Sequence, residues 1–230
     1  MLSLSDTGRA RSPRMDRRTS GDQVASHIRR LIFEGRLRQG DHVRQDDIAA
    51  ELGVSRIPVR EAIIALDREG WVTIEPHRGA FVYGLDENSV RDHYEVLGVL
   101  YGLGSRRATE RGDDEAMATL KTIAKELAGT TDVDVFGHVN GDFWRQIFWM
   151  AHSPRLSSLF RVMTGIVPGN FFAGVPGTMQ QQKKGVASLL RHIVARDGDA
   201  AERECVGLLR QQGEMVLDLL RSRELFRPPA

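Results

Sequence analysis

The sequence predicts a mainly α-helical protein built from a small N-terminal unit and a C-terminal all-α bundle of six or seven helices. Two observations carry this prediction. Apolar residues recur at helical spacing over most of the chain. Good strand formers gather in one short stretch only, "WVTIEPHRGAFVY" at 71–83. A chain of 230 residues, 41% of them hydrophobic, can form one large domain or two small ones, and we expect two.

Composition excludes several classes of protein. The formal net charge of +1 excludes a globally polycationic chain, so any surface for nucleic acid must be local. A single cysteine, Cys205, rules out an intramolecular disulfide and a cysteine-clustered metal site. The longest apolar run, "VLGVLYGLG", is far shorter than the ~20 residues of a membrane span, and the N-terminus lacks a secretory signal. We therefore expect a cytoplasmic protein without a membrane partner.

The N-terminal unit reads as three short helices and a hairpin. Ser20 and Gln23 have the spacing of a capping box, Gly53 stops the second helix, and Ser55 is the expected N-cap of the third. The expected helices span about 20–35, 45–52 and 55–69, and the strands 71–74 and 80–83. We expect a domain over 20–84, preceded by a disordered tail over 1–19 whose five arginines and two aspartates leave a charge of +3. Phosphate contact and simple solvation by this tail both remain open.

The second half, over 86–227, reads as helices separated by short breaks. Asp113 and Asp199 are expected N-caps, and "VPGNFFAGVPG" is the expected long loop. Three glycines in the first helix, each costing about 1 kcal/mol relative to alanine, indicate close helix packing or a kink. The expected helices span 89–111, 113–128, 133–151, 155–167, 178–196 and 199–225.

A helix-turn-helix is indicated where the second and third helices meet. The small and apolar positions that this motif needs are filled by Ile48, Ala49, Leu52, Gly53, Val54 and Val59. Arg56 and Arg60 stand four apart, on one helix face. With the core buried, they and Ser55 lie at the exposed start of the helix that enters the major groove in this motif. Arginine matches the two acceptors of guanine bidentately, so this face is a candidate for DNA binding.

The hairpin that follows makes the unit a winged helix. Its tip carries His77, Arg78 and Gly79, placed to reach the adjacent minor groove or backbone. The alternative is a solvated surface in which the two helix arginines pair with nearby acids, Glu61 or Asp67. The combination of motif core, cap and wing favours DNA binding over that alternative.

The stretch "DDIAAELGVSRIPVREAIIALDREGWVTIEPHRGAFV" resembles the N-terminal winged helix of the GntR family of bacterial transcription regulators, over about 22–84. The resemblance implies that Arg56 and Arg60 read bases, that Ser55 and the wing contact DNA, and that a homodimer binds a palindromic double-stranded operator. The branch often carries an arginine where this chain has Asp46, and Arg44 is the candidate substitute. Over 21–80 nine arginines face ten acids, so affinity must come from placement and from two subunits.

The helical half resembles the FadR-like branch, whose C-terminal domain binds ligands and dimerises. Many members hold a divalent metal there through an Asp, a His four residues later and two further histidines. The corresponding positions in this chain are Asn140 and Trp144, followed by Val186 and Leu208 or by Ser188 and Arg210. We therefore predict no metal and no cofactor. His138, Asp142 and His192 leave a displaced metal site open, beside the alternative of surface or hydrogen-bonded histidines.

Loss of these polar groups indicates an apolar or amphipathic effector, such as a fatty acyl or aromatic compound. The resemblance to the branch also implies a small carboxylate metabolite as the alternative. Leu97 and Tyr101 also stand where the branch commonly has an Arg and a Glu. The candidate effector-binding residues are Leu97, Tyr101, Asn140, Trp144 and Leu208. Aromatic residues at helical spacing are equally compatible with a filled core and no effector.

Other classes of function find less support in the sequence. Phosphate-binding, nucleophile and zinc-hydrolase motifs are absent, so we do not expect an enzyme. A winged-helix protein–protein adaptor is the alternative, but two arginines at exposed positions speak against it. The sequence thus predicts a DNA-binding regulator, a repressor rather than an activator, whose operator affinity a small molecule shifts.

Overall fold

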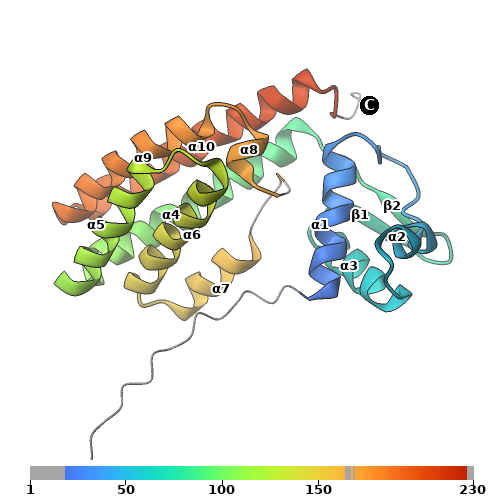
Figure 1. Ribbon diagram of the computed structural model, residues 1–230, viewed down its shortest axis with the longest axis horizontal. Helices are drawn as coiled ribbons and strands as arrows, with labels where there is room; N and C mark the ends of the chain where they lie inside the picture. The colour runs from blue at the N-terminus through green and yellow to red at the C-terminus, as the bar shows by residue number, and fades with distance from the viewer. Residues whose placement is uncertain (1–18, 164–166, 168, 227–230) are drawn as a thin grey trace, which may run out of the picture.

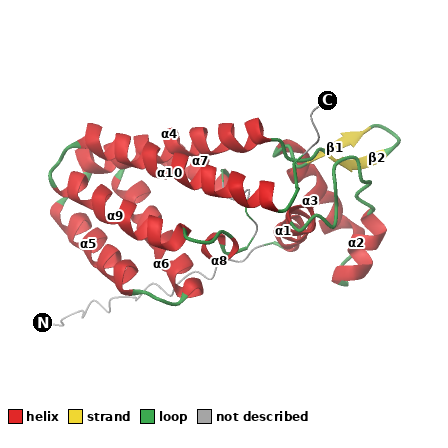
Figure 2. Cartoon of the chain, turned by 90° about the horizontal axis from the view of Figure 1, so that it is seen from above, coloured by secondary structure: helices red, strands yellow, loops and turns green. Residues whose placement is uncertain are grey.

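The computed structural model describes residues 19–163, 167 and 169–226. Within these ranges the protein is mainly α-helical, with one two-stranded sheet, as Figures 1 and 2 show. A small unit with the sheet is followed by an elongated bundle of helices, which confirms the predicted fold class. No helix among the described residues is long and apolar enough to cross a membrane. The predicted basic tail lies outside the described residues, apart from Thr19.

The N-terminal unit is a winged helix-turn-helix. Its elements are α1 (Ser20–Phe33), α2 (Gln45–Leu52), α3 (Arg56–Arg68), β1 (Val72–Glu75) and β2 (Gly79–Val82). Helix α3 packs against both α1 and α2, and the strands pair antiparallel from Val72↔Val82 to Glu75↔Gly79. Ile28, Val59 and Leu66 are among the buried residues that join these helices. Gly53 ends α2 in the left-handed region, at φ 64°, as the turn requires.

Three predicted helix caps differ from the structure. Thr19, rather than Ser20, caps α1: its hydroxyl accepts from the Asp22 backbone N–H, and the Asp22 carboxylate accepts from the Thr19 N–H. Ser55 occupies the N-cap position of α3, but its side chain makes no capping hydrogen bond. Asp197, rather than Asp199, caps the last helix by accepting from the Ala200 N–H. Neighbouring residues of the same chemistry compete for a cap, and the backbone geometry decides between them.

The C-terminal domain is a bundle of seven helices among the described residues. They are α4 (Glu87–Arg111), α5 (Asp114–Gly129), α6 (Val133–Met150), α7 (Pro154–Val162), α8 (Phe171–Gly174), α9 (Thr178–Val194) and α10 (Gly198–Ser222). The long helices α4 and α10 lie side by side, and α6 and α9 pack on them (Figure 1). The short α8 lies in the stretch predicted as a loop, where the Asn170 side chain accepts from the Phe172 N–H.

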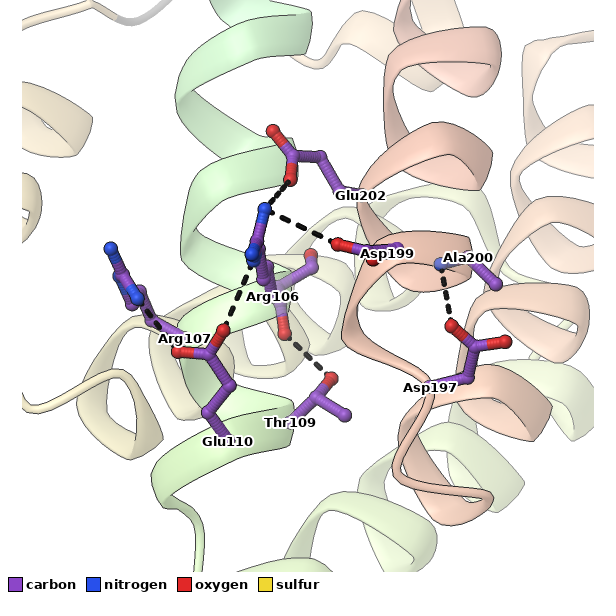
Figure 3. A network of polar contacts seen from close by, with 9 residues as sticks. Arg106, Arg107, Thr109, Glu110, Asp197, Asp199, Ala200 and Glu202 are labelled. Carbon is purple, nitrogen blue, oxygen red and sulfur yellow. Dashed lines mark hydrogen bonds and ion pairs between the residues drawn. The ribbon is translucent and has the colours of Figure 1, made fainter.

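Close approach explains the glycines of α4, which is continuous from Glu87 to Arg111. A Cβ on Gly102 would lie 3.1 Å from the Glu202 carbonyl oxygen of α10. Figure 3 shows the ion pairs at the same end of these helices: Arg106 of α4 contacts Asp199 at 3.2 Å and Glu202 at 3.3 Å. Backbone proximity and this network hold the start of α10 against α4.

The end of α10 runs back to the winged helix. Arg221 donates from Nε to Oε1 of Glu87 at 2.9 Å, at the start of α4. The Arg223 guanidinium lies over the Phe33 ring of α1, 5.1 Å from its centroid. Leu85, in the connection between the two domains, forms a parallel bridge with Phe226. Helix α10 and the residues that follow it therefore contact the bundle, the connection between the domains and the winged helix.

Candidate nucleic-acid interface

The N-terminal turn of α3 presents polar and apolar side chains to solvent. Val59, Ala62, Ile63 and Leu66 are the buried residues of this helix. Ser55, Arg56 and Arg60 are exposed, as predicted, and the Ser55 hydroxyl makes no hydrogen bond within the described part of the chain. Ile57, which the sequence reading missed, is 70% exposed between them. A large exposed apolar side chain beside two arginines suits contact with a thymine methyl group.

The two arginines in the first turns of α3, Arg56 and Arg60, have different surroundings. Arg56 pairs with Asp46 at the start of α2, with 2.6 Å from Nε to Oδ1 and 3.0 Å from Nη2 to Oδ2. Arg60 has no hydrogen bond or ion pair among the described residues. The alternative partner Asp67 instead accepts from the Ile74 N–H at 2.9 Å, which ties α3 to β1. The alternative in which Arg56 and Arg60 pair with Glu61 or Asp67 of the same helix is therefore not found in the structure.

The wing is a tight hairpin whose second strand hydrogen-bonds to the segment before α2. Val43 donates its N–H to the Ala80 carbonyl at 2.8 Å, which covers the edge of β2. His77 and Gly79 both have positive φ, at 63° and 103°. A Cβ on Gly79 would overlap Nε2 of His42, so glycine is required there for space as well as for conformation.

The other residues predicted to contact DNA are exposed, with the exception of Gly79. His77 is exposed at the tip of the hairpin, and Gly79 is half-buried. Arg78 is 70% exposed, pairs with Glu75, and lies 5.3 Å from the Phe81 ring centroid. Arg44 is exposed at the N-cap of α2, with no capping bond from its side chain. Of the exposed arginines predicted to contact DNA, Arg56 and Arg78 pair with neighbouring acids, whereas Arg44 and Arg60 have no acid partner among the described residues.

Most of the predicted effector residues lie in or against the buried core of the bundle. Tyr101 of α4 and Trp144 of α6 are in edge-to-face contact, with ring centroids 4.6 Å apart, and Phe148 and Phe160 complete the aromatic cluster. Burial raises the pKa of the Tyr101 hydroxyl. Leu97 is buried in the same core. These rings pack against one another, so this part of the interior is filled by side chains.

Asn140, which is partly buried, belongs with two buried glutamines to a chain of amides that the sequence did not predict. Its Oδ1 accepts from Nε2 of Gln182 at 2.7 Å, and Oε1 of Gln182 accepts from Nε2 of Gln212 at 2.6 Å. The chain joins α6, α9 and α10, and Gln182 is only 1% exposed. The bundle interior is therefore not purely apolar. The sequence offered a weak signal, because the "QQQ" run at 180–182 gives no sign of which glutamine faces inward.

Leu208 of α10 is only 4% exposed and belongs to the same buried core as Leu97 and Trp144. It packs against Gly185 and lines an open groove of about 590 Å³ between α9 and α10. The cations Lys184 and Arg203 line the groove too, and His192 lies 3.9 Å from Glu204 there. Of the five candidate effector residues, Leu97, Trp144 and Leu208 therefore belong to the buried core, Tyr101 packs against it, and Asn140 belongs to the amide chain.

The displaced metal site is not assembled in the described structure. Nδ1 of His138 lies 2.7 Å from the Asp134 carbonyl oxygen, and Asp142 pairs with Arg145 in the next turn of the same helix. His192 faces Glu204 rather than either of them. Across the described ranges no three His, Cys, Asp or Glu side chains are grouped so that they could hold a metal ion.

The fold and the exposed helix define a winged-helix regulator with a helical second domain, and comparison with known proteins gives its family. Residues 20–82 match the bacterial regulatory proteins of the gntR family, and residues 92–211 match the FCD domain. The chain belongs to the GntR family of transcription regulators and carries an FCD domain.

Named relatives agree with this assignment. An uncharacterised HTH-type transcriptional regulator of Mycobacterium tuberculosis is 30% identical over 212 residues, 90% of this chain and 85% of that protein. A probable D-xylose utilization operon transcriptional repressor of Paenarthrobacter nicotinovorans is 33% identical over 64% of this chain and 66% of its own length.

Solved structures show the same fold. The E. coli protein McbR/YncC is 19% identical and matches with a TM-score of 0.60, over 89% of this chain and 99% of that one. A GntR family member from Pseudomonas syringae is 24% identical with a TM-score of 0.54, over 89% and 87% of the two chains.

Proposed function

We propose that this chain acts in the cytoplasm as a homodimeric repressor that binds a palindromic double-stranded operator and releases it in response to a small effector. The winged helix of residues 20–84 would bind DNA, and residues 86–227 would dimerise and bind the effector. The observation that carries the proposal is the exposed start of α3, where Arg56 and Arg60 stand on a buried three-helix core.

In this proposal Arg56 and Arg60 of α3 read bases, and the cations without acid partners attract the phosphates. Arg60 and Arg44 are exposed and unpaired among the described residues, so they can neutralise phosphates or reach base edges. Ser55 can donate its hydroxyl to a phosphate, and His77, Arg78 and Gly79 bring the wing to the neighbouring groove. Because the unit has nearly equal numbers of acids and arginines, one copy alone binds DNA weakly. Two copies on one operator supply the affinity.

A winged-helix protein–protein adaptor, the alternative function, would not depend on Arg56 and Arg60 for DNA binding, and this difference can be tested. Operator sequences can be selected from a random DNA pool with the full chain, and affinities measured by gel shift. Replacing Arg56 and Arg60 together with alanine should abolish specific binding, since each good guanine contact contributes ~1–3 kcal/mol of discrimination. Arg68→Ala is the matched control, because Arg68 is exposed at the far end of the same helix. Equal operator affinity of the double variant and the control would support an adaptor.

The effector site is supported by the amide chain and the aromatic cluster together. Asn140 and the two glutamines offer neutral hydrogen-bonding groups inside the bundle, next to an aromatic core that includes Tyr101 and Trp144. The rings fill this part of the interior, so a ligand enters only when they move apart. It then meets apolar and polar groups together, which suits a small molecule with an apolar body and one polar end, including a carboxylate. Thermal denaturation against a panel of fatty and aromatic acids tests this. A ligand that binds only the native state must raise the melting temperature, and no rise with any acid counts against the site.

Helix α10 connects this site to the DNA-binding domain. Gln212 and Leu208 lie in its middle, and Arg223 at its end lies over Phe33 of the winged helix. An effector that favours one position of α10 changes how the two α3 helices of a dimer are spaced, and so shifts operator affinity. Arg223→Ala should weaken the effector's influence on operator affinity. If the effector changes the operator affinity of this variant as much as that of the unaltered chain, the contact between Arg223 and Phe33 does not transmit the effect.

A further inference from the structure

The Arg56–Asp46 pair has a geometry suited to holding an arginine for one particular base contact. We infer that Asp46 is a positioning residue for sequence readout: it fixes the Arg56 guanidinium so that its free edge meets the two acceptors of one guanine. This inference rests on the proposed DNA-binding function and assigns to Asp46 a part in base specificity.

The pair occupies one edge of the guanidinium and leaves another open. Nε and Nη2 of Arg56 face the two carboxylate oxygens of Asp46, at 2.6 and 3.0 Å. A guanidinium has five N–H groups in a planar fork, one on Nε and two on each Nη. Three therefore remain, two on Nη1 and one on Nη2. The edge between these two atoms is the one that can donate in parallel to O6 and N7 of guanine.

The pair is not needed to hold the fold together. The side chains of Arg56 and Asp46 are 75% and 66% exposed, and ion pairs this exposed contribute little to stability. Helices α2 and α3 are already joined by buried apolar residues, among them Ile48 and Val59. What the pair does change is the freedom of a long side chain, which would otherwise be lost on binding DNA.

The two arginines of this face would contribute differently to DNA binding: Arg56 through a fixed orientation, and Arg60 through its charge. Arg56 with Asp46 is a neutral unit, so it adds hydrogen bonds at fixed angles and little attraction to phosphates. Arg60, four residues later on the same face, is unpaired and supplies charge without a fixed orientation. The same operator half-site should therefore contain one base position that depends on Asp46 and another that does not.

The experiment compares base preferences of the full chain, Asp46→Ala and Asp47→Ala on the operator selected with the unaltered chain. Asp47 is the matched control, because it is also exposed in the first turn of α2 and pairs with no arginine among the described residues. Both variants lose one negative charge at the same helix end. Each operator position is replaced in turn, and relative affinities are measured by competition.

One operator position should lose its guanine preference in Arg56→Ala. At that position we expect Asp46→Ala to reduce the preference for guanine about tenfold, which corresponds to the entropy cost of ordering one arginine side chain. The preference at the position lost in Arg60→Ala should stay unchanged, and Asp47→Ala should shift affinity equally for all sequences. Combining Asp46→Ala with Arg56→Ala should add nothing at the Arg56 position.

Two other results are distinguishable. If Asp46→Ala raises affinity for every sequence equally and keeps all base preferences, Asp46 only opposes the phosphates and the inference is wrong. If the unaltered chain selects no sequence from the pool, or if Arg56→Ala and Arg60→Ala change nothing, the proposed function itself fails, independently of Asp46.

Discussion

Replacing Gln182 with alanine should destabilise the bundle strongly for an uncharged polar residue. The change removes both hydrogen bonds of the amide chain and leaves Oδ1 of Asn140 and Nε2 of Gln212 without their partners. An unsatisfied buried polar group costs ~1–3 kcal/mol. Because Asn140 is only partly buried, we take the lower end for it and expect about 3 kcal/mol in total. In a protein of this size that corresponds to a fall of roughly 6–12 °C in melting temperature.

The chain supplies its own control for this prediction. Gln180 lies two residues earlier on α9 and is exposed, so Gln180→Ala should change the free energy of unfolding by less than about 0.5 kcal/mol. Thermal or urea unfolding followed by circular dichroism measures both variants. If Gln182→Ala unfolds at the same temperature as Gln180→Ala, the amide chain does not stabilise the domain and its role as the polar part of an effector site loses its basis.

Three further predictions concern charge, the wing and pH. Operator affinity should depend less steeply on salt in Arg60→Ala than in Arg56→Ala, because only the unpaired arginine releases counterions fully; equal slopes would contradict this. Gly79→Ala should distort the wing through positive φ and overlap with His42, lowering the free energy of unfolding by ~1–3 kcal/mol; calorimetry showing no change would refute it. Burial lowers the pKa of His93 to about 4 from its ordinary 6.5. The unfolded chain thus binds the extra proton first, so stability should fall as pH drops from 6.5 toward 4, and less so in His93→Gln in urea titrations.

Local signals in the sequence were sufficient for most of the winged helix. Helix α2 has the predicted bounds, because a left-handed glycine, Gly53, ends it and no nearby residue competes for that role. The caps at Ser20 and Asp199 were misplaced by one or two residues, because a second residue of suitable chemistry stood beside each. Element type therefore followed from hydrophobic spacing, whereas exact ends depended on backbone geometry.

Contacts between distant elements could not be read from the sequence. The partner of Arg56 was sought among acids of its own helix, but the packing of α2 on α3 brings Asp46 to it from ten residues away. Gln182 and Gln212 are 30 residues apart and meet only because α9 and α10 pack against each other. Spacing predicts which residues share one helix face, and tertiary packing decides which faces meet.

The most direct test of DNA recognition by α3 is methylation interference on the selected operator. A methyl group on guanine N7 blocks the acceptor that a bidentate arginine needs. We expect methylation of symmetry-related guanines in both half-sites to prevent binding. Arg60→Ala should tolerate methylation at one of these guanines in each half-site, the one that Arg60 contacts. Binding by the unaltered chain that tolerates N7 methylation at every guanine would contradict base reading by Arg56 and Arg60.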